Sequence, residues 1–254
     1  MIFYLGDGIL SFEFLKKHFG RFLTLNFTNK FIITYFLSWM GLFGTLTVSK
    51  LLKPLFNVET AGKITVVKYE AISSAVSSQM GINYYSIGIS YFLSNYLACI
   101  TIFLAFSILS YLYKKDISKG KSTLNDYFNS ILLFYVIVVI NPLTGVLGVN
   151  IPFSDLLAVI PHGIFEYAGF SLSIVLGIEY TLYKLPISKP FESWDNKKKI
   201  LFLIKLILVP LLILISGFTE TLDWLILNYA KENNLPILET FFNVYYSILK
   251  SIIL

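Results

Sequence analysis

Five long apolar segments most constrain what this chain can fold into. They cover residues 31–52, 86–113, 130–148, 156–183 and 200–222, and each carries few charges. About 20 apolar residues in a helix are enough to cross the hydrocarbon core of a bilayer. Only 14% of the 254 residues are charged, against about 25% in a typical soluble domain. The pattern predicts an all-α, polytopic integral membrane helix bundle whose main partner is the lipid bilayer.

The remaining segments complete a single membrane domain over residues 1–254. Residues 1–30 mix aromatic, aliphatic and charged side chains, which is typical of an amphipathic helix that lies in the membrane interface. Residues 53–85 are too polar to span, so we expect an external loop with a short helix around residues 70–80. Residues 86–224 form the predicted core region.

The last segment, residues 235–254, leaves two alternatives open. Its polar side chains fall on one stripe at helical spacing: Glu239, Asn243, Ser247 and Lys250. A sixth span is possible if this stripe faces protein, and an interfacial helix is the other possibility. The bundle is therefore expected to have five or six transmembrane helices.

Basic residues are distributed unevenly between the two sides that these spans define. Thirteen lie in the N-terminal segment and in the connections after the second and fourth spans, and five lie on the opposite side. Lysine and arginine accumulate in cytoplasmic loops. We therefore expect a multi-pass protein of the cell membrane with a cytoplasmic N-terminus.

Several functional classes find no support in the sequence. The net charge of +5 comes from lysines clustered between apolar segments, so nucleic acid is not an expected partner. Cys99 is the only cysteine, which excludes a disulfide within the chain and a cysteine metal framework. No cleavable signal peptide, phosphate-binding loop or hydrolase motif is evident. We expect no enzyme activity, no cofactor and no metal.

The fourth apolar segment contains an unusual pair of ionisable residues. His162 and Glu166 are four residues apart, so they share one helix face. Ionisable side chains inside a span are costly and normally face the bundle interior. Counting about 1.5 Å per residue from each predicted span end brings further polar residues to the same outer half of the membrane. The predicted polar intramembrane cluster is Asn95, Asn141, His162, Glu166 and Glu220.

The motif Pro161-His162-Gly163-x-x-Glu166 also carries a resemblance. Followed by "GFSLSIVLG" and by a glutamate near the end of the next span, in "SGFTETLDW", it resembles the stage II sporulation protein M family. The similarity covers residues 91–224. It implies a membrane component of a complex that contains cell-envelope proteins, which in spore-forming bacteria are peptidoglycan hydrolases.

Two functional hypotheses follow. The first is a non-enzymatic membrane scaffold, in which His162 and Glu166 only hold helices together. The second is a channel or transporter whose path for an ion or small solute runs through the cluster. One histidine with two or three carboxylates could also bind a divalent ion, and catalysis is a further alternative. Gly41 and Gly44 permit close helix contacts, which predicts a homo-oligomer.

Overall fold

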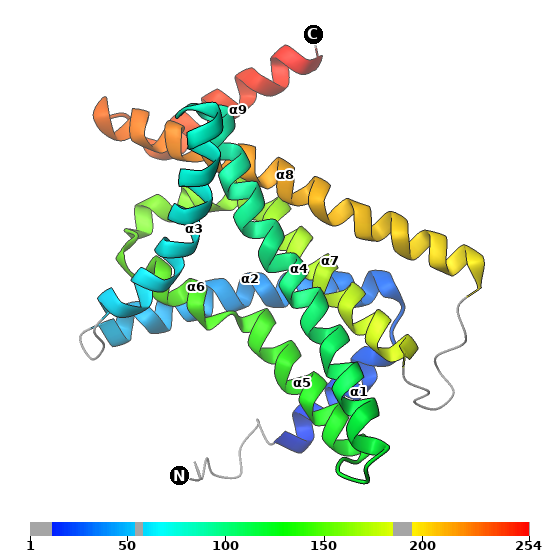
Figure 1. Cartoon of the computed structure of the whole chain (residues 1–254). Coiled ribbons are helices and arrows are strands. Elements are labelled where there is room, and N and C mark those ends of the chain that lie inside the picture. Colours follow the sequence, from blue (N-terminus) through cyan, green and yellow to red (C-terminus); the bar gives the residue numbers. More distant parts are fainter. Residues whose placement is uncertain (1–11, 54–57, 185–194, 254) are drawn as a thin grey trace.

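The computed structural model describes residues 12–53, 58–184 and 195–253. Within these ranges the chain is helical and contains no strand (Figure 1). The elements in chain order are α1 Phe12–Thr24, α2 Phe27–Leu52, α3 Val58–Met80, α4 Tyr84–Ile117, α5 Leu124–Ile140, α6 Pro142–Leu147, the 3-10 turns η2 Gly148–Asn150 and η3 Phe153–Val159, α7 Ile160–Lys184, α8 Asn196–Glu232 and α9 Ile237–Ile253.

The lengths and apolar character of these helices confirm the membrane fold class. Four segments are long and apolar enough to cross a bilayer: α2, α4, η3 with α7, and α8. Helix α5 is a shorter apolar helix of 17 residues. Together these five correspond to the five apolar segments of the sequence.

The third predicted span is interrupted where the sequence places Asn141-Pro142. Helix α5 ends at Ile140, and Asn141 takes a left-handed conformation with φ 44°. Pro142 has no backbone N–H to donate, so it begins the separate short helix α6 instead of extending α5. The fourth span likewise has a broken start, because η3 precedes α7 and Pro161 lies in the first turn of α7.

Helices α4, α7 and α8 form the most closely packed part of the bundle. A Cβ atom on Gly217 of α8 would lie 2.6 Å from the backbone oxygen of Gly88 on α4. Side chains from α7 bridge to α4 as well, since the Ser173 hydroxyl donates to the Cys99 carbonyl at 2.6 Å. Glycines at such crossings bring helix backbones into contact, as is common in membranes.

Two expectations outside the core need revision. Residues 53–85 were expected as a loop with a short helix, but most of the segment is the 23-residue helix α3, which ends only where Gly81 takes a positive φ of 71°. For the last segment the interfacial alternative fits better, because α9 is absent from the helices that are apolar enough to span and docks on η3 and the end of α8. Residues 1–11 of the predicted interfacial helix lie outside the described residues, and the remainder forms α1.

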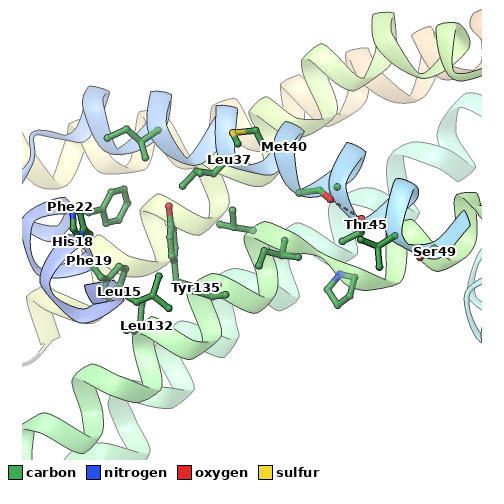
Figure 2. A pocket seen from close by; sticks show the side chains of 18 of the residues that line it. Leu15, His18, Phe19, Phe22, Leu37, Met40, Thr45, Ser49, Leu132 and Tyr135 are labelled. Atoms are coloured by element: carbon green, nitrogen blue, oxygen red, sulfur yellow. Dashed lines mark hydrogen bonds between the residues drawn. The ribbon is translucent and has the colours of Figure 1, made fainter. Parts of the chain in front are cut away.

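An apolar groove of about 1110 Å³ separates α1 and α5 from part of α2 (Figure 2). Gly41 and Gly44 both line it, but they differ in their packing. A Cβ on Gly41 would lie 2.6 Å from the Val139 carbonyl oxygen of α5, whereas one on Gly44 would meet nothing within 4 Å. Gly41 therefore serves the α2–α5 contact, and Gly44 leaves the groove open.

Candidate functional site

The polar centre of the bundle lies between α7 and α8. His162 and Glu166 are on successive turns of α7, and Glu220 faces them from α8. One ligand atom of each residue lies within 4.8 Å of the others. His162 is buried, and the two glutamates are partly buried. We call these three residues the His–Glu–Glu cluster.

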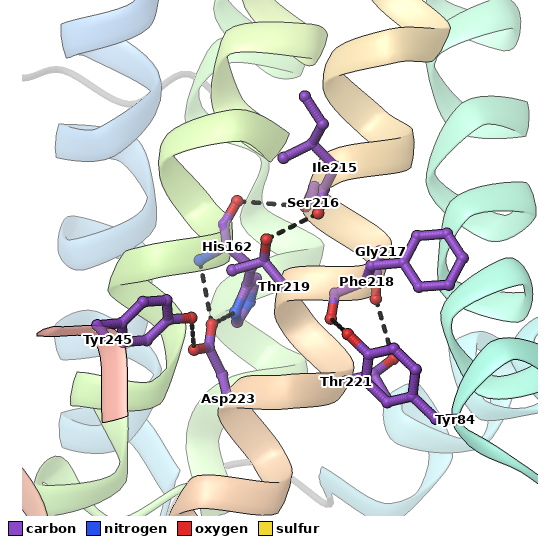
Figure 3. A network of polar contacts seen from close by, with 10 residues as sticks. All are labelled: Tyr84, His162, Ile215, Ser216, Gly217, Phe218, Thr219, Thr221, Asp223 and Tyr245. Atoms are coloured by element: carbon purple, nitrogen blue, oxygen red, sulfur yellow. Dashed lines mark hydrogen bonds and ion pairs between the residues drawn. The ribbon is translucent and has the colours of Figure 1, made fainter. Parts of the chain in front are cut away.

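Asp223 of α8 holds the histidine of this cluster through two contacts (Figure 3). Its Oδ2 atom accepts from the His162 backbone N–H at 3.1 Å and lies 2.8 Å from the ring atom Nδ1. The first turn of a helix has backbone N–H groups without an intrahelical acceptor, so Asp223 caps the start of α7 from another helix. An ionised carboxylate can only accept, which assigns the proton to Nδ1. The other ring nitrogen, Nε2, is then available to the glutamates.

Two further hydroxyl groups fix this arrangement. The Tyr245 hydroxyl of α9 donates to Asp223 Oδ1 at 2.5 Å, and the Ser216 hydroxyl of α8 donates to the His162 carbonyl at 3.2 Å. Figure 3 shows Tyr245 approaching Asp223 from the side opposite to the histidine ring. Both oxygens of the fully buried Asp223 are thus hydrogen-bonded, and α9 completes the site.

The cluster and its surroundings contain more acidic than basic side chains. Three carboxyl groups, on Glu166, Glu220 and Asp223, surround a single imidazole. Like charges in a low-dielectric interior destabilise one another unless a proton or a cation intervenes. Glu220 Oε2 is moreover buried without a hydrogen-bond partner. The arrangement is therefore chemically suited to take up positive charge.

The structure brings together only part of the predicted polar cluster. His162, Glu166 and Glu220 meet, whereas Asn141 is the C-cap residue of α5. Asn95 is half-buried on α4, on the same helix face as Phe92 and Cys99. Within the described part of the chain, its side chain makes no hydrogen bond to the cluster. The place of the two asparagines in the cluster therefore stays a prediction, since span depth gives a level in the membrane but not the rotation of a helix.

Pro161 and Gly163 of the motif both have structural roles. Pro161 is accommodated in the first turn of α7, where a missing N–H costs little. Gly163 gives room to a side chain, because a Cβ there would lie 2.7 Å from the Trp39 ring of α2. The expected close approach at Gly163 is therefore made by a tryptophan.

Asp223 and Tyr245 were missed by the sequence reasoning. The direct partner of His162 is Asp223, which the predicted polar cluster does not include. The predicted fifth span ended at residue 222, which left Asp223 outside the membrane, whereas α8 continues to Glu232. The spacing of Ser216, Glu220 and Asp223 along one helix face was the signal that could have identified it.

A second ion pair lies near the other end of α7. The Lys30 ammonium of α2, which is 2% exposed, donates to the Glu179 carboxylate. Lys30 is thus the partner of Glu179, a residue that the predicted polar cluster does not include. This pair joins the beginning of α2 to α7, about 20 Å along α7 from Glu166 at 1.5 Å per residue.

Apolar packing fills the bundle between the His162–Asp223 pair and the Lys30–Glu179 pair. The α7 side chains here are at most 5% exposed: Leu172, Ile174, Val175, Leu176 and Ile178. They pack against buried residues of α4 and α8, among them Phe106 and Ile213. The cluster thus lies near one end of the bundle and is separated from the other end by a closely packed apolar layer.

Comparison with known proteins identifies a relative. The chain is 38% identical over 242 residues to uncharacterized protein MJ0096 of Methanocaldococcus jannaschii, and the match covers 88% of this chain and 90% of the archaeal protein. The chain belongs to the family of this archaeal protein. No protein-family model matches the chain, and no solved structure matches it.

Proposed function

We propose that the protein is a non-enzymatic transporter of the cell membrane that binds a cation at the His–Glu–Glu cluster. The observation that carries this proposal is the excess of carboxyl groups over basic groups in the cluster, with Glu220 Oε2 left without a partner. An unpaired polar group in hydrocarbon costs roughly several kcal/mol, and a bound cation would offset that cost at Glu220.

The position of the cluster favours a transporter over an open channel. His162 lies in the first turn of α7, close to the end of the bundle that η3 and α9 cover. Toward the other end, the apolar layer around Ile174 and Ile178 blocks a continuous polar path. A buried polar site near one end of the bundle, closed off from the other end by apolar packing, fits a carrier that must change conformation to release its ion.

Ion flux in proteoliposomes tests the proposal. The purified full-length chain is reconstituted with indicators for protons, monovalent ions and divalent ions. We expect flux for one class of ion, at least tenfold lower in Glu166→Gln, which keeps the side-chain shape but removes one charge. Glu239→Gln on the exposed face of α9 is the matched control and should transport normally. Absence of flux for every class, with folded protein in the vesicles, would reject the proposal.

The Pro161–Glu166 motif supports a second candidate function. Its resemblance to the stage II sporulation protein M family favours a scaffold that holds cell-envelope or membrane proteins. We propose a homo-oligomer in either case, because Gly44 lies open in the apolar groove of α1, α2 and α5. A dimer in nanodiscs that Gly44→Trp dissociates would support the assembly, and a monodisperse monomer would contradict it.

A further inference from the structure

The residues that face one another in the cluster are a typical set of metal ligands. An imidazole nitrogen and carboxylate oxygens are the donors preferred by divalent first-row transition ions such as Zn²⁺, Mn²⁺ and Fe²⁺. His162, Glu166 and Glu220 offer three such atoms within 4.8 Å of one another. Ligand atoms of a tetrahedral zinc site lie about 3.4 Å apart, given bond lengths near 2.1 Å. Small rotations of the two glutamate side chains would therefore close the site around an ion.

We propose that His162, Glu166 and Glu220 bind one divalent transition-metal ion, with Asp223 and Tyr245 as positioning residues. This inference rests on the proposed function and deepens it, because it names the class of cation. The site differs from a plain acidic cluster in containing a buried histidine, of which Asp223 holds Nδ1 and leaves Nε2 as the coordinating nitrogen. It also contains Glu220 Oε2, a buried oxygen that has no hydrogen-bond partner and lies on the residue that faces the other two ligands.

The support behind His162 is the arrangement that histidine ligands normally require. A metal-binding histidine almost always donates its second ring N–H to a carboxylate or carbonyl, which fixes the tautomer and the ring orientation. Asp223 Oδ2 does this at 2.8 Å from Nδ1, and it also holds the His162 backbone N–H. Tyr245 fixes the other oxygen of Asp223. The ring is thus held by three interactions that do not involve the coordinating nitrogen.

The ligand types also define which ions the site should reject. Ca²⁺ prefers six to eight oxygen ligands, and Mg²⁺ usually keeps several waters and binds through carboxylates. A site with three protein ligands, one of them imidazole, suits neither ion. We therefore expect selectivity for transition ions over Ca²⁺ and Mg²⁺.

Metal binding to the full-length chain tests the inference without any transport assay. The protein is purified with its affinity tag removed, stripped with a chelator, and titrated with Zn²⁺ and with Co²⁺, whose visible absorption reports its ligands. We expect about one ion per chain, with no competition from millimolar Ca²⁺ or Mg²⁺. Glu220→Gln and Glu166→Gln should each weaken binding more than tenfold. Tyr245→Phe should weaken it by up to about tenfold, and Glu239→Gln should bind like the unaltered protein.

The outcomes separate this inference from the proposed function. Equal Zn²⁺ affinity in Glu220→Gln and the unaltered chain, or binding well below one ion per chain, would overturn the metal site. Melting temperatures of all variants are measured in parallel, and because the two glutamine variants lie on different helices, loss of folding in one leaves the other as the test. Stoichiometric binding without flux would keep the metal site and reject the transporter. Flux of protons without metal binding would keep the transporter and reject the metal site.

Discussion

At the scale of single residues, Glu220 is the ligand on which the proposed metal site depends most. Its Oε2 atom is buried and unpaired, and its carboxylate faces that of Glu166. Natural proteins commonly sacrifice stability at functional sites. The cluster fits that description, because its carboxylates destabilise the metal-free bundle.

We expect Glu220→Gln to raise the stability of the metal-free protein by roughly 1 kcal/mol, since the amide can donate to Glu166 and leaves one acidic group fewer in the buried cluster. For a chain of this size the corresponding rise in melting temperature is about 2–4 °C. Thermal unfolding in detergent with a chelator present measures it. A fall in melting temperature would mean that Glu220 only holds helices together.

The residue scale is also where sequence reasoning was weakest. His162 and Glu166 were identified because ionisable residues are conspicuous in an apolar segment. Asp223 was not, since a hydropathy window ends a span where charges begin and ignores that α8 continues. Tyr245 was out of reach, because nothing in a sequence indicates which side chain of α9 turns toward α8.

At the scale of helices, glycine positions decide how closely the bundle packs. Gly217 lies at the α4–α8 contact one turn before Glu220, and an added Cβ would lie 2.6 Å from a backbone oxygen. Backbone cannot move aside as a flexible side chain can. Gly44 is also helical, but a Cβ added there would meet none of the described residues within 4 Å, which makes it a suitable comparison within the single chain.

We expect Gly217→Ala to destabilise the protein by roughly 1–3 kcal/mol through overpacking and to weaken metal binding by shifting Glu220. Gly44→Ala should be neutral or slightly stabilising, because alanine has the higher helix propensity. Thermal unfolding and Zn²⁺ titration of both variants test this. Equal effects of the two substitutions would argue against a close α4–α8 crossing.

The start of α5 provides a pH-dependent element. Asp126 Oδ2 accepts from the Thr123 hydroxyl at 2.7 Å and from its backbone N–H at 2.9 Å. These hydrogen bonds hold the pKa of the Asp126 carboxyl below its usual value. The folded pKa is thus lower than the unfolded one, so the stabilisation is present above about pH 4 and is lost as the pH falls through the folded pKa.

We expect Thr123→Ala to lower the melting temperature by roughly 2–4 °C at pH 7, since it removes the N-cap and the donor to Asp126. The difference from the unaltered protein should shrink as the pH falls below about 4. Melting curves across this range measure it. A difference that is independent of pH would show that the carboxylate contributes nothing to the cap.

Helix positions themselves were largely predictable from the sequence. Apolar segments located α2, α4, α5, α7 and α8 because span length is fixed by the bilayer. The break at Asn141-Pro142 was predictable too, since proline cannot continue a helix. The length of α3 was not, because its mixed polar sequence has neither a clear apolar period nor a decisive breaker before Gly81.

At the scale of the whole molecule, the lysines differ between the two ends of the bundle. Around the 3-10 turns and α3, lysines are engaged in contacts: Lys50 with the Val149 and Ile151 carbonyls, Lys68 with the Ser94 carbonyl at 2.6 Å, and Lys231 with Asp155 at 2.5 Å. At the other end Lys30 is buried against Glu179, but exposed lysines are clustered in the connections between helices, at Lys114, Lys115, Lys119, Lys121 and Lys197. Clusters of exposed lysines attract anionic lipid headgroups.

We therefore expect the end that carries the exposed lysines to face the cytoplasm. Single cysteines replace Lys119, Lys197 or Glu232 in a Cys99→Ala background, and intact cells are treated with a membrane-impermeant maleimide. Glu232→Cys should be labelled directly, because α8 is about 55 Å long and places its two ends on opposite sides. The two lysine positions should react only after permeabilisation. Labelling of Lys119→Cys and Glu232→Cys from the same side would overturn the topology.

The capping of α7 by Asp223 has a consequence for biosynthesis. The ribosome completes α7 before it has made α8, so His162 and Glu166 enter the translocon without the carboxylate that holds the start of their helix. Although α7 is mostly apolar, unpaired ionisable side chains weaken the retention of a helix in lipid. We expect α7 to remain beside the translocon until α8 emerges and to enter the bilayer together with it as a hairpin. Nascent chains halted before residue 216 should then leave α7 incompletely inserted, and chains halted well beyond Glu232 should not.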